Sequence, residues 1–216
     1  MKNKSLFLTY LSAVTLVVGL VTGCATDNYH KGAGTASALT YSSQLITKGS
    51  SQIDDSQAAL NDLVSNPQPD LTKQYDAFNL AVNNLGATAK DVADKTAAMK
   101  AQGAAYFAGW DNDIATMHNE DIRTRSEARR NEVAARFNRI SLQYDQARIA
   151  FEPYMSDLRD VQKYLSTDLT SGGLAGIKGV AVKTTNDAEP LKSTLAKLSE
   201  QFKELGDSMA PTTASN

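Results

Sequence analysis

The residue types that most often perform catalysis are scarce in this chain. Nucleophilic catalysis needs a Ser, Thr or Cys that is activated by a base and oriented by an acid, and the sequence has only two histidines. His30 lies in a polar, glycine-containing segment and His118 precedes an expected helix start, so we interpret both as solvated side chains. Neither has a cysteine or second histidine at zinc-ligand spacing. The sequence predicts no catalytic residue, no metal ligand and no cofactor.

Two short motifs resemble ligand loops but lack their essential residues. Asp111-Asn112-Asp113 begins like a calcium loop, yet Ala115 stands at the next ligand position and the required glycine is missing. The glycine-rich segment 172–179 lacks the Gly-Lys-Ser/Thr ending of a phosphate loop and follows a predicted helix rather than a strand. We interpret the first as a solvated helix face and the second as a turn that opens a helix. A weaker alternative is that residues 172–182, apolar apart from Lys178, contact a membrane or a partner.

The single cysteine, Cys24, has the most informative surroundings. Residues 1–23 combine a short positive start with an uncharged apolar stretch, which is typical of a secretory signal peptide and too short for a membrane span. Val21-Thr22-Gly23-Cys24 resembles the lipobox of bacterial lipoproteins, which implies that Cys24 becomes a lipidated N-terminus, the membrane anchor. An exported protein with an odd cysteine needs a partner or a modification for it, and lipid attachment supplies one.

The resemblance to lipoproteins implies a place in the bacterial envelope, facing the periplasm. Ala25 stands where many lipoproteins retained in the inner membrane carry Asp, so the outer membrane is favoured. Removing Lys2 and Lys4 from the 22 basic side chains leaves 20 against 24 acidic ones, a formal charge of −4. This balance argues against nucleic acid as a partner.

All eight arginines lie between Arg123 and Arg159, together with acidic residues at helical spacing. The simplest interpretation is a lattice of i to i+4 salt bridges on exposed helix faces. Arg123, Arg125, Arg129 and Arg130 nevertheless cluster at an expected hairpin tip where apolar residues are sparse. Guanidinium groups there are candidates for binding anionic groups of envelope lipids or of a partner.

Helical periodicity dominates the rest of the chain. Residues 25–36 are small and polar and predict a flexible tether. Residues 37–64 carry an apolar residue every seventh position, and Pro67 and Pro69 end that helix, with Asp70 as the expected cap of the next. Apolar residues then alternate in steps of three and four in three further rows. The rows are 71–110, 133–165 and 174–205.

The breaks between these rows predict the turns. A reversal is expected at Asn119, where a capping residue precedes acids, and another at 170–173. Pro153 predicts a kink, because the row continues in phase on both sides. We therefore expect an all-α fold, an elongated antiparallel helical bundle or coiled coil with a long central hairpin. The expected organisation is signal peptide 1–23, Cys24 and tether 24–36, helical domain 37–206 and disordered tail 207–216.

The predicted helix lengths also orient the bundle. At about 1.5 Å per residue, the second helix overshoots the start of the first by roughly 30 Å, back towards Cys24. The arginine tip is then expected on the membrane side, where anionic headgroups attract basic residues.

Several scattered segments resemble a family of Gram-negative helical lipoproteins classed as a domain of unknown function. The resemblance covers roughly residues 106–205. The segments that carry it are Phe107-Ala108-Gly109-Trp110, Ile122-Arg123-Thr124-Arg125-Ser126, Tyr144-Asp145, Phe151-Glu152-Pro153-Tyr154 and Leu158-Arg159-Asp160-Val161. It implies no catalytic residue. Our first hypothesis is a non-enzymatic scaffold or interaction module that self-associates or binds an envelope protein, and the alternative is an adaptor subunit of a transport or lipid-handling complex.

Overall fold

The computed structural model describes residues 24–211, with side chains from Asn28 onward. The expected signal peptide, 1–23, and residues 212–216 of the expected tail lie outside the described residues. Within the described range the regular elements are all α-helices: α1 (Cys24–Ser65), α2 (Thr72–Ala115), α3 (Glu120–Thr167) and α4 (Ser171–Met209).

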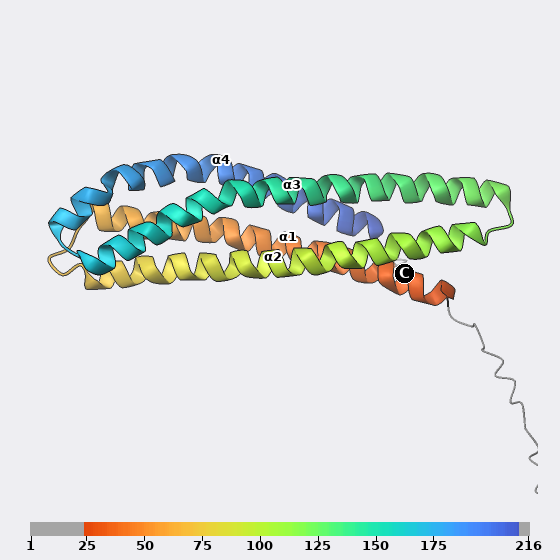
Figure 1. Cartoon of the computed structure of the whole chain (residues 1–216), viewed down its shortest axis with the longest axis horizontal. Helices are drawn as coiled ribbons and strands as arrows, with labels where there is room; N and C mark the ends of the chain where they lie inside the picture. The colour runs from red at the N-terminus through yellow and green to blue at the C-terminus, as the bar shows by residue number, and fades with distance from the viewer. Residues whose placement is uncertain (1–23, 212–216) are drawn as a thin grey trace, which may run out of the picture.

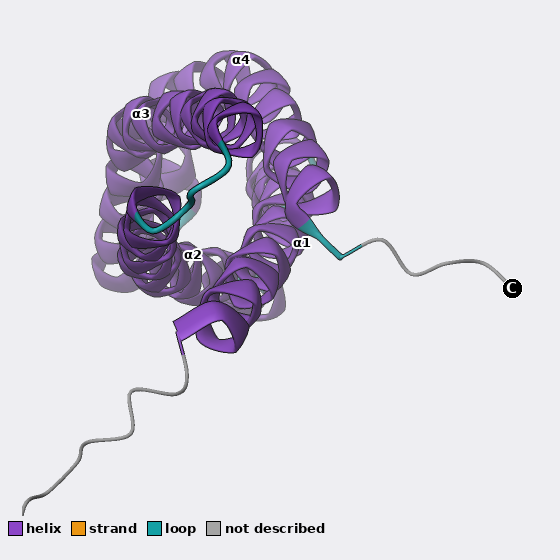
Figure 2. Cartoon of the chain, turned by 90° about the vertical axis from the view of Figure 1, so that its right-hand side faces the viewer, coloured by secondary structure: helices purple, strands orange, loops and turns teal. Residues whose placement is uncertain are grey.

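The helices run alternately in opposite directions and form a ring in chain order (Figures 1 and 2). Each helix packs against its neighbours in sequence, and α4 closes the ring against α1. The backbone of α1 packs extensively against α2 and α4, whereas α2 and α3 pack least extensively. The expected all-α antiparallel bundle is confirmed, and its long central hairpin consists of α2, with 44 residues, and α3, with 48.

The predicted apolar rows face the interior. Leu39, Ile46, Ile53 and Leu60 on α1 are buried, and so are most members of the other three rows. They form two apolar clusters, one towards the 66–71 and 168–170 turns and one towards the other end. A period of seven residues in steps of three and four keeps one face of each helix towards the ring, and this is why the sequence pattern identified the core.

The first turn and the reversal fall where the sequence placed them, but the turn expected at 170–173 is wrong in its bounds, because α3 ends at Thr167 and α4 begins at Ser171. At the reversal, α2 ends at Ala115 and the side chain of Asn119 accepts a hydrogen bond from the backbone N–H of Ile122, 3.1 Å away, as a helix cap. The Thr170 hydroxyl caps α4 in the same way, through the N–H of Gly173. Asp70 accepts from the Thr72 N–H but lies one residue before the cap position, which Leu71 occupies. The helix α3 continues through Pro153, as expected.

The expected tether is wrong for the described residues, because α1 begins at Cys24. The polar residues of this segment find partners that solvent-exposed chain would lack. Asn28 donates to Asp113 on α2, and Thr35 donates to the Lys31 carbonyl. Gly32 lets α1 approach α2 closely, since a Cβ there would lie 2.9 Å from Cε2 of Tyr106. Tertiary packing therefore outweighs the low helix propensity of the segment.

The expected helix end at Gly206 is also wrong, because α4 runs on to Met209 and residues 207–209 are helical rather than tail. A glycine that ends a helix commonly adopts a left-handed conformation, but none of the described glycines has a positive φ. A Cβ at Gly206 would lie 2.8 Å from the Thr40 hydroxyl and 3.0 Å from the Ala36 carbonyl oxygen. This glycine serves the close packing of α1 against α4, and α4 continues through it.

Candidate functional site

The end of the bundle that holds Cys24 brings together the start of α1 and the α2–α3 reversal. The Asn28 amide donates to the Asp113 carboxylate across 3.1 Å. Gly109 makes room for that contact, since a Cβ there would meet the Asn28 side chain at 2.9 Å from its Cγ. These contacts hold the first turns of α1 against the last turns of α2.

The helix α2 does not extend beyond the start of α1 by the expected distance of roughly 30 Å. Residues 24–36 are helical, which lengthens α1 by about 20 Å. Asn28 consequently lies level with Gly109 and Asp113, near the end of α2 at Ala115. The reversal still points to the Cys24 end, but α1 reaches almost as far as the hairpin does (Figure 1).

The four arginines of the hairpin tip do not share one environment. Arg123 pairs with Glu120 and lies 3.9 Å from Glu127, and the hydrogen bond with Glu120 raises the pKa of its guanidinium. Arg129 pairs with Glu132 at 2.9 Å and donates to the Ser208 carbonyl of α4. The ion pairs each stabilise one turn of α3, and the hydrogen bond from Arg129 to Ser208 joins α3 to α4.

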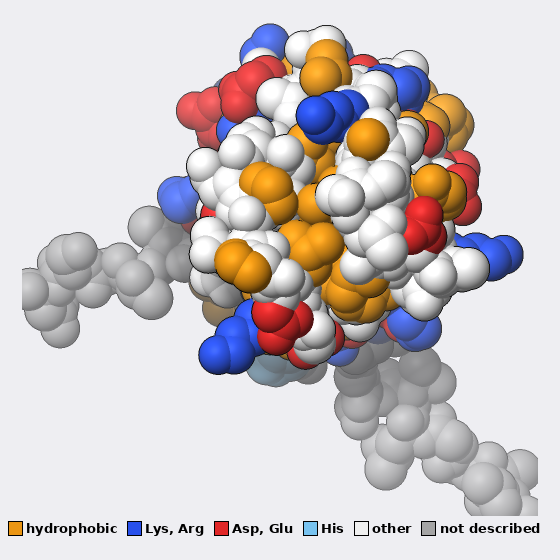
Figure 3. Space-filling model, turned by 90° about the vertical axis from the view of Figure 1, so that its left-hand side faces the viewer, with side chains coloured by type: hydrophobic (Ala, Val, Ile, Leu, Met, Phe, Trp, Pro, Cys, Tyr) orange, Lys and Arg blue, Asp and Glu red, His pale blue; other side chains and the backbone are white. Residues whose placement is uncertain are grey.

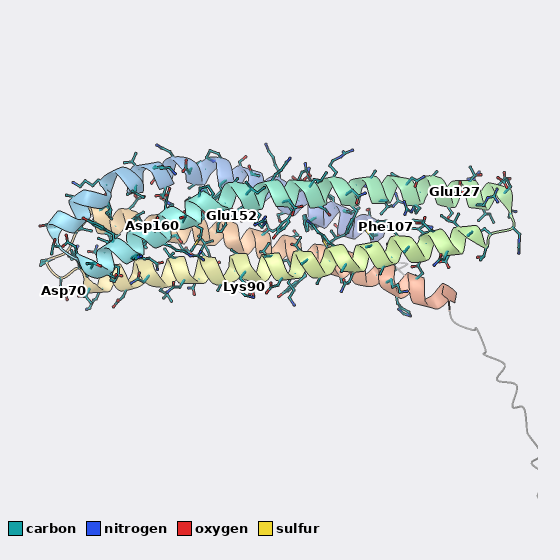
Figure 4. All side chains as sticks on the ribbon, viewed as in Figure 1. Asp70, Lys90, Phe107, Glu127, Glu152 and Asp160 are labelled. Carbon is teal, nitrogen blue, oxygen red and sulfur yellow. The ribbon has the colours of Figure 1, made fainter. Side chains whose placement is uncertain are left out.

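Arg130 joins α3 to α2. Its guanidinium lies 2.7 Å from the Asp111 carboxylate and 5.6 Å from the centroid of the Phe107 ring. Figure 4 shows Phe107 between the two helices and Glu127 nearer the reversal. Arg125 is exposed and has no ion pair or hydrogen bond within the described part of the chain. The interpretation as salt bridges within one helix thus accounts for Arg123 and Arg129, whereas Arg130 pairs between helices. Of the four arginines, Arg125 alone has no ion pair in the described part of the chain.

Apolar side chains are exposed at the same end. Ile122, in the first turn of α3, is 57 % exposed, and Tyr29, in the second turn of α1, is 59 % exposed. Behind them the indole N–H of Trp110 donates to the Ser126 hydroxyl across 2.9 Å. This bond fixes the two arms of the hairpin to each other below the reversal.

The histidines and the acidic residues of the calcium-like motif lie apart or have structural partners. His30 packs edge-on against Tyr29, with ring centroids 5.5 Å apart, and His118 is exposed in the reversal. Asp111 and Asp113 bind Arg130 and Asn28. No group of three metal-binding side chains occurs in the range that the structure describes. Segment 172–179 opens α4, as expected, but it is helical and not a turn.

Two hollows were not expected from the sequence. A mid-bundle cavity of about 80 Å³ lies between all four helices, where the small residues Gly49, Thr88, Ala89 and Ala147 face one another. A larger groove of about 820 Å³ crosses the opposite end, between the 66–71 and 168–170 turns. Figure 3 looks onto this end and shows apolar surface at its centre. Pro67, Pro69, Leu169 and Leu174 line the groove, and Lys178 stands beside it.

Buried polar contacts were not expected from the sequence, because Gln57, Ser43 and Ser199 lie beside the apolar rows and not in them. Gln57 donates to the Tyr154 hydroxyl at 2.9 Å and accepts from Thr185 at 2.9 Å. Burial raises the pKa of Tyr154 to about 12. The Ser199 hydroxyl lies 2.9 Å from that of Ser43 on α1. These contacts fix the register of α1 against α3 and α4.

None of the helices in the described range is long and apolar enough to cross a membrane. Comparison with curated proteins and with solved structures finds no match. Comparison with protein families matches residues 36–207, nearly the whole helical bundle, to one family. The chain belongs to the family described as Protein of unknown function (DUF2959).

Proposed function

We propose that the chain is a lipid-anchored scaffold or interaction module of the bacterial envelope, without enzymatic activity. The observation that carries this proposal is the position of Cys24. It ends the lipobox-like segment and is also the first residue of α1, so a lipid on it would hold a rigid helical rod by one end. With 44 residues in α2, the rod is about 66 Å long, which suits a spacer or a scaffold.

The use of polar side chains supports a structural rather than a chemical role. Several partly exposed charged residues make ion pairs between helices. Examples are Lys100 with Asp145, 2.8 Å apart, and Lys192 with Asp54, 2.6 Å apart. Catalytic groups usually lie together in a pocket that admits a substrate.

Metabolic labelling with a palmitate analogue tests the anchor. The wild-type protein should incorporate the label and migrate as the processed form, and Cys24→Ser should remain an unlabelled precursor. A labelled, processed Cys24→Ser protein would show that the lipid is attached elsewhere or that Cys24 is not the anchor.

Fractionation of the two membranes tests the location, which we propose is the outer membrane. Ala25→Asp, with all other residues unchanged, should move the protein to the inner membrane.

The groove at the far end favours a second candidate, an adaptor within an envelope complex. It lies at the end of α1 opposite Cys24, and it combines apolar walls with Lys178, which has no ion pair in the described structure. A photo-crosslinking residue at Ala175 in cells distinguishes the two roles. An adaptor should give one dominant heterologous product, and a self-associating scaffold should give a product of twice the chain mass. The control carries the same photo-crosslinking residue in place of Ala104, on an exposed face of α2.

A further inference from the structure

The start of α1 and the α2–α3 reversal form one rigid unit. The hydrogen bond between Asn28 and Asp113 and the close approaches at Gly32 and Gly109 fix α1 within its first turns. Only residues 25–27 separate Cys24 from Asn28, and they continue the helix. A lipid on Cys24 therefore cannot enter a membrane while the reversal stays far above it.

The exposed side chains at this end suit the boundary between headgroups and acyl chains. Tyr29 carries an aromatic ring with a polar tip, the type of side chain enriched at membrane interfaces. Ile122 exposes a large apolar side chain where nothing in the described structure covers it. Arg125 adds an unpaired cation with a stem long enough to reach phosphate groups.

We propose that the α2–α3 reversal, together with Ile122 and Tyr29, sits in the headgroup layer of the membrane, so that the bundle stands end-on. This inference rests on the proposed lipid attachment at Cys24. The reversal is a second contact beside the lipid, and the two contacts together fix the direction of the rod. The groove between the 66–71 and 168–170 turns then lies about 60 Å from the membrane, since α1 has 42 residues.

Apolar insertion, rather than general charge attraction, drives this contact. Three of the four arginines are paired within the bundle. Acidic side chains are also present at this end, namely Asp111, Asp113, Glu120, Asp121 and Glu127. Among the side chains that the structure describes, this end has no excess of unpaired positive charge, so its contact with the membrane should depend only weakly on anionic lipid. A basic patch would instead give binding that falls steeply with salt.

Lipid quenching of a site-specific fluorophore tests the orientation. The mature lipidated protein is purified from membranes and placed in phosphatidylcholine vesicles that carry a spin-labelled quencher near the headgroups. The only native cysteine is Cys24, whose thiol is occupied by the lipid, so one introduced cysteine is labelled selectively. His118→Cys reports on the reversal and Gln68→Cys on the far end. We expect quenching to be several-fold stronger at 118 than at 68, with little change when phosphatidylglycerol or salt is added.

A pair of matched variants tests the role of Ile122. Ile122→Asp should reduce quenching at 118, whereas Leu142→Asp, at an equally exposed apolar position in the middle of α3, should leave it unchanged. Circular dichroism verifies that both proteins are folded. Equal quenching at 118 and 68 would overturn the end-on orientation, and an unchanged signal in Ile122→Asp would overturn the insertion. Mass spectrometry of the same sample shows whether the lipid is present. Its absence would instead refute the proposed function, and the end-on seating with it.

Discussion

The ring of Phe137 lies directly over Gly103. A Cβ at position 103 would lie 2.8 Å from both Cε atoms of the ring, which is closer than real side chains approach each other. Phe137 also packs edge-on against Phe107, with ring centroids 5.5 Å apart, so it has little room to move. The missing side chain of Gly103 is therefore part of the contact between α2 and α3.

We expect Gly103→Ala to destabilise the protein, even though alanine is the better helix former. Overpacking of a filled core typically costs about 1–3 kcal/mol, which exceeds the roughly 1 kcal/mol gained in helix propensity. Urea unfolding followed by circular dichroism measures the difference. A variant more stable than the wild type by the full gain in helix propensity would mean that the Phe137 ring moves aside without cost.

Gly49→Ala should have the opposite effect. A Cβ at Gly49 would meet only the Thr88 methyl group, at 3.8 Å, and it would point to the wall of the mid-bundle cavity. Replacing a helix-interior glycine with alanine contributes roughly 0.5–1 kcal/mol when no contact is strained. Comparing the two alanine variants in one urea series separates packing from propensity, and a loss of stability at Gly49 would contradict the open space described here.

Two alanine substitutions in the apolar rows should lower the free energy of unfolding by unequal amounts. Phe137 is 5 % exposed, so Phe137→Ala should cost about 3–5 kcal/mol. Leu195 belongs to the apolar row 174–205, but it is only partly buried and lines the cavity. Leu195→Ala should therefore cost less than 2 kcal/mol, below the usual range of roughly 2–5 kcal/mol for a buried leucine. Exposed Leu142→Ala is the control, and similar losses for all three would show that the rows are misassigned.

Features that repeat along one helix could be predicted from the sequence, whereas contacts between two helices could not. The burial of Ile53, Phe78 and Leu158 follows from the spacing of apolar residues alone. Gly206 looked like a helix end because a glycine can serve either a left-handed turn or a close approach, and the sequence does not distinguish them. Arg148 with Glu152 follows from i to i+4 spacing, but Arg130 with Asp111 depends on the register of α2 against α3.

The pKa of Tyr154 predicts a loss of stability at high pH. Burial raises this pKa to about 12, above the value of about 10 in the unfolded chain. The neutral phenol is favoured in the fold, so its contribution is fully present below pH 10 and is lost as the pH rises from about 10 to about 12. Tyr154→Phe should remove this part of the pH dependence. Because other groups titrate in the same range, the measured quantity is the difference between wild-type and Tyr154→Phe unfolding midpoints across it, which should shrink with rising pH.

Arg130 and Arg125 should respond differently to the same substitution. Arg130→Gln removes the ion pair with Asp111 and the contact over Phe107, and it should cost on the order of 1 kcal/mol for a partly exposed pair. Arg125→Gln removes no contact within the described structure and should leave the unfolding midpoint unchanged. A coupling close to zero in the double-mutant cycle of Arg130→Gln with Asp111→Asn would contradict the bridge between α2 and α3.

Because Arg125→Gln should leave the fold intact, it is also the variant that tests whether Arg125 binds an external anion. The measurement is binding of the lipidated protein to anionic and neutral supported bilayers. Replacing all four arginines at once would mix that question with the loss of the ion pairs of Arg123, Arg129 and Arg130.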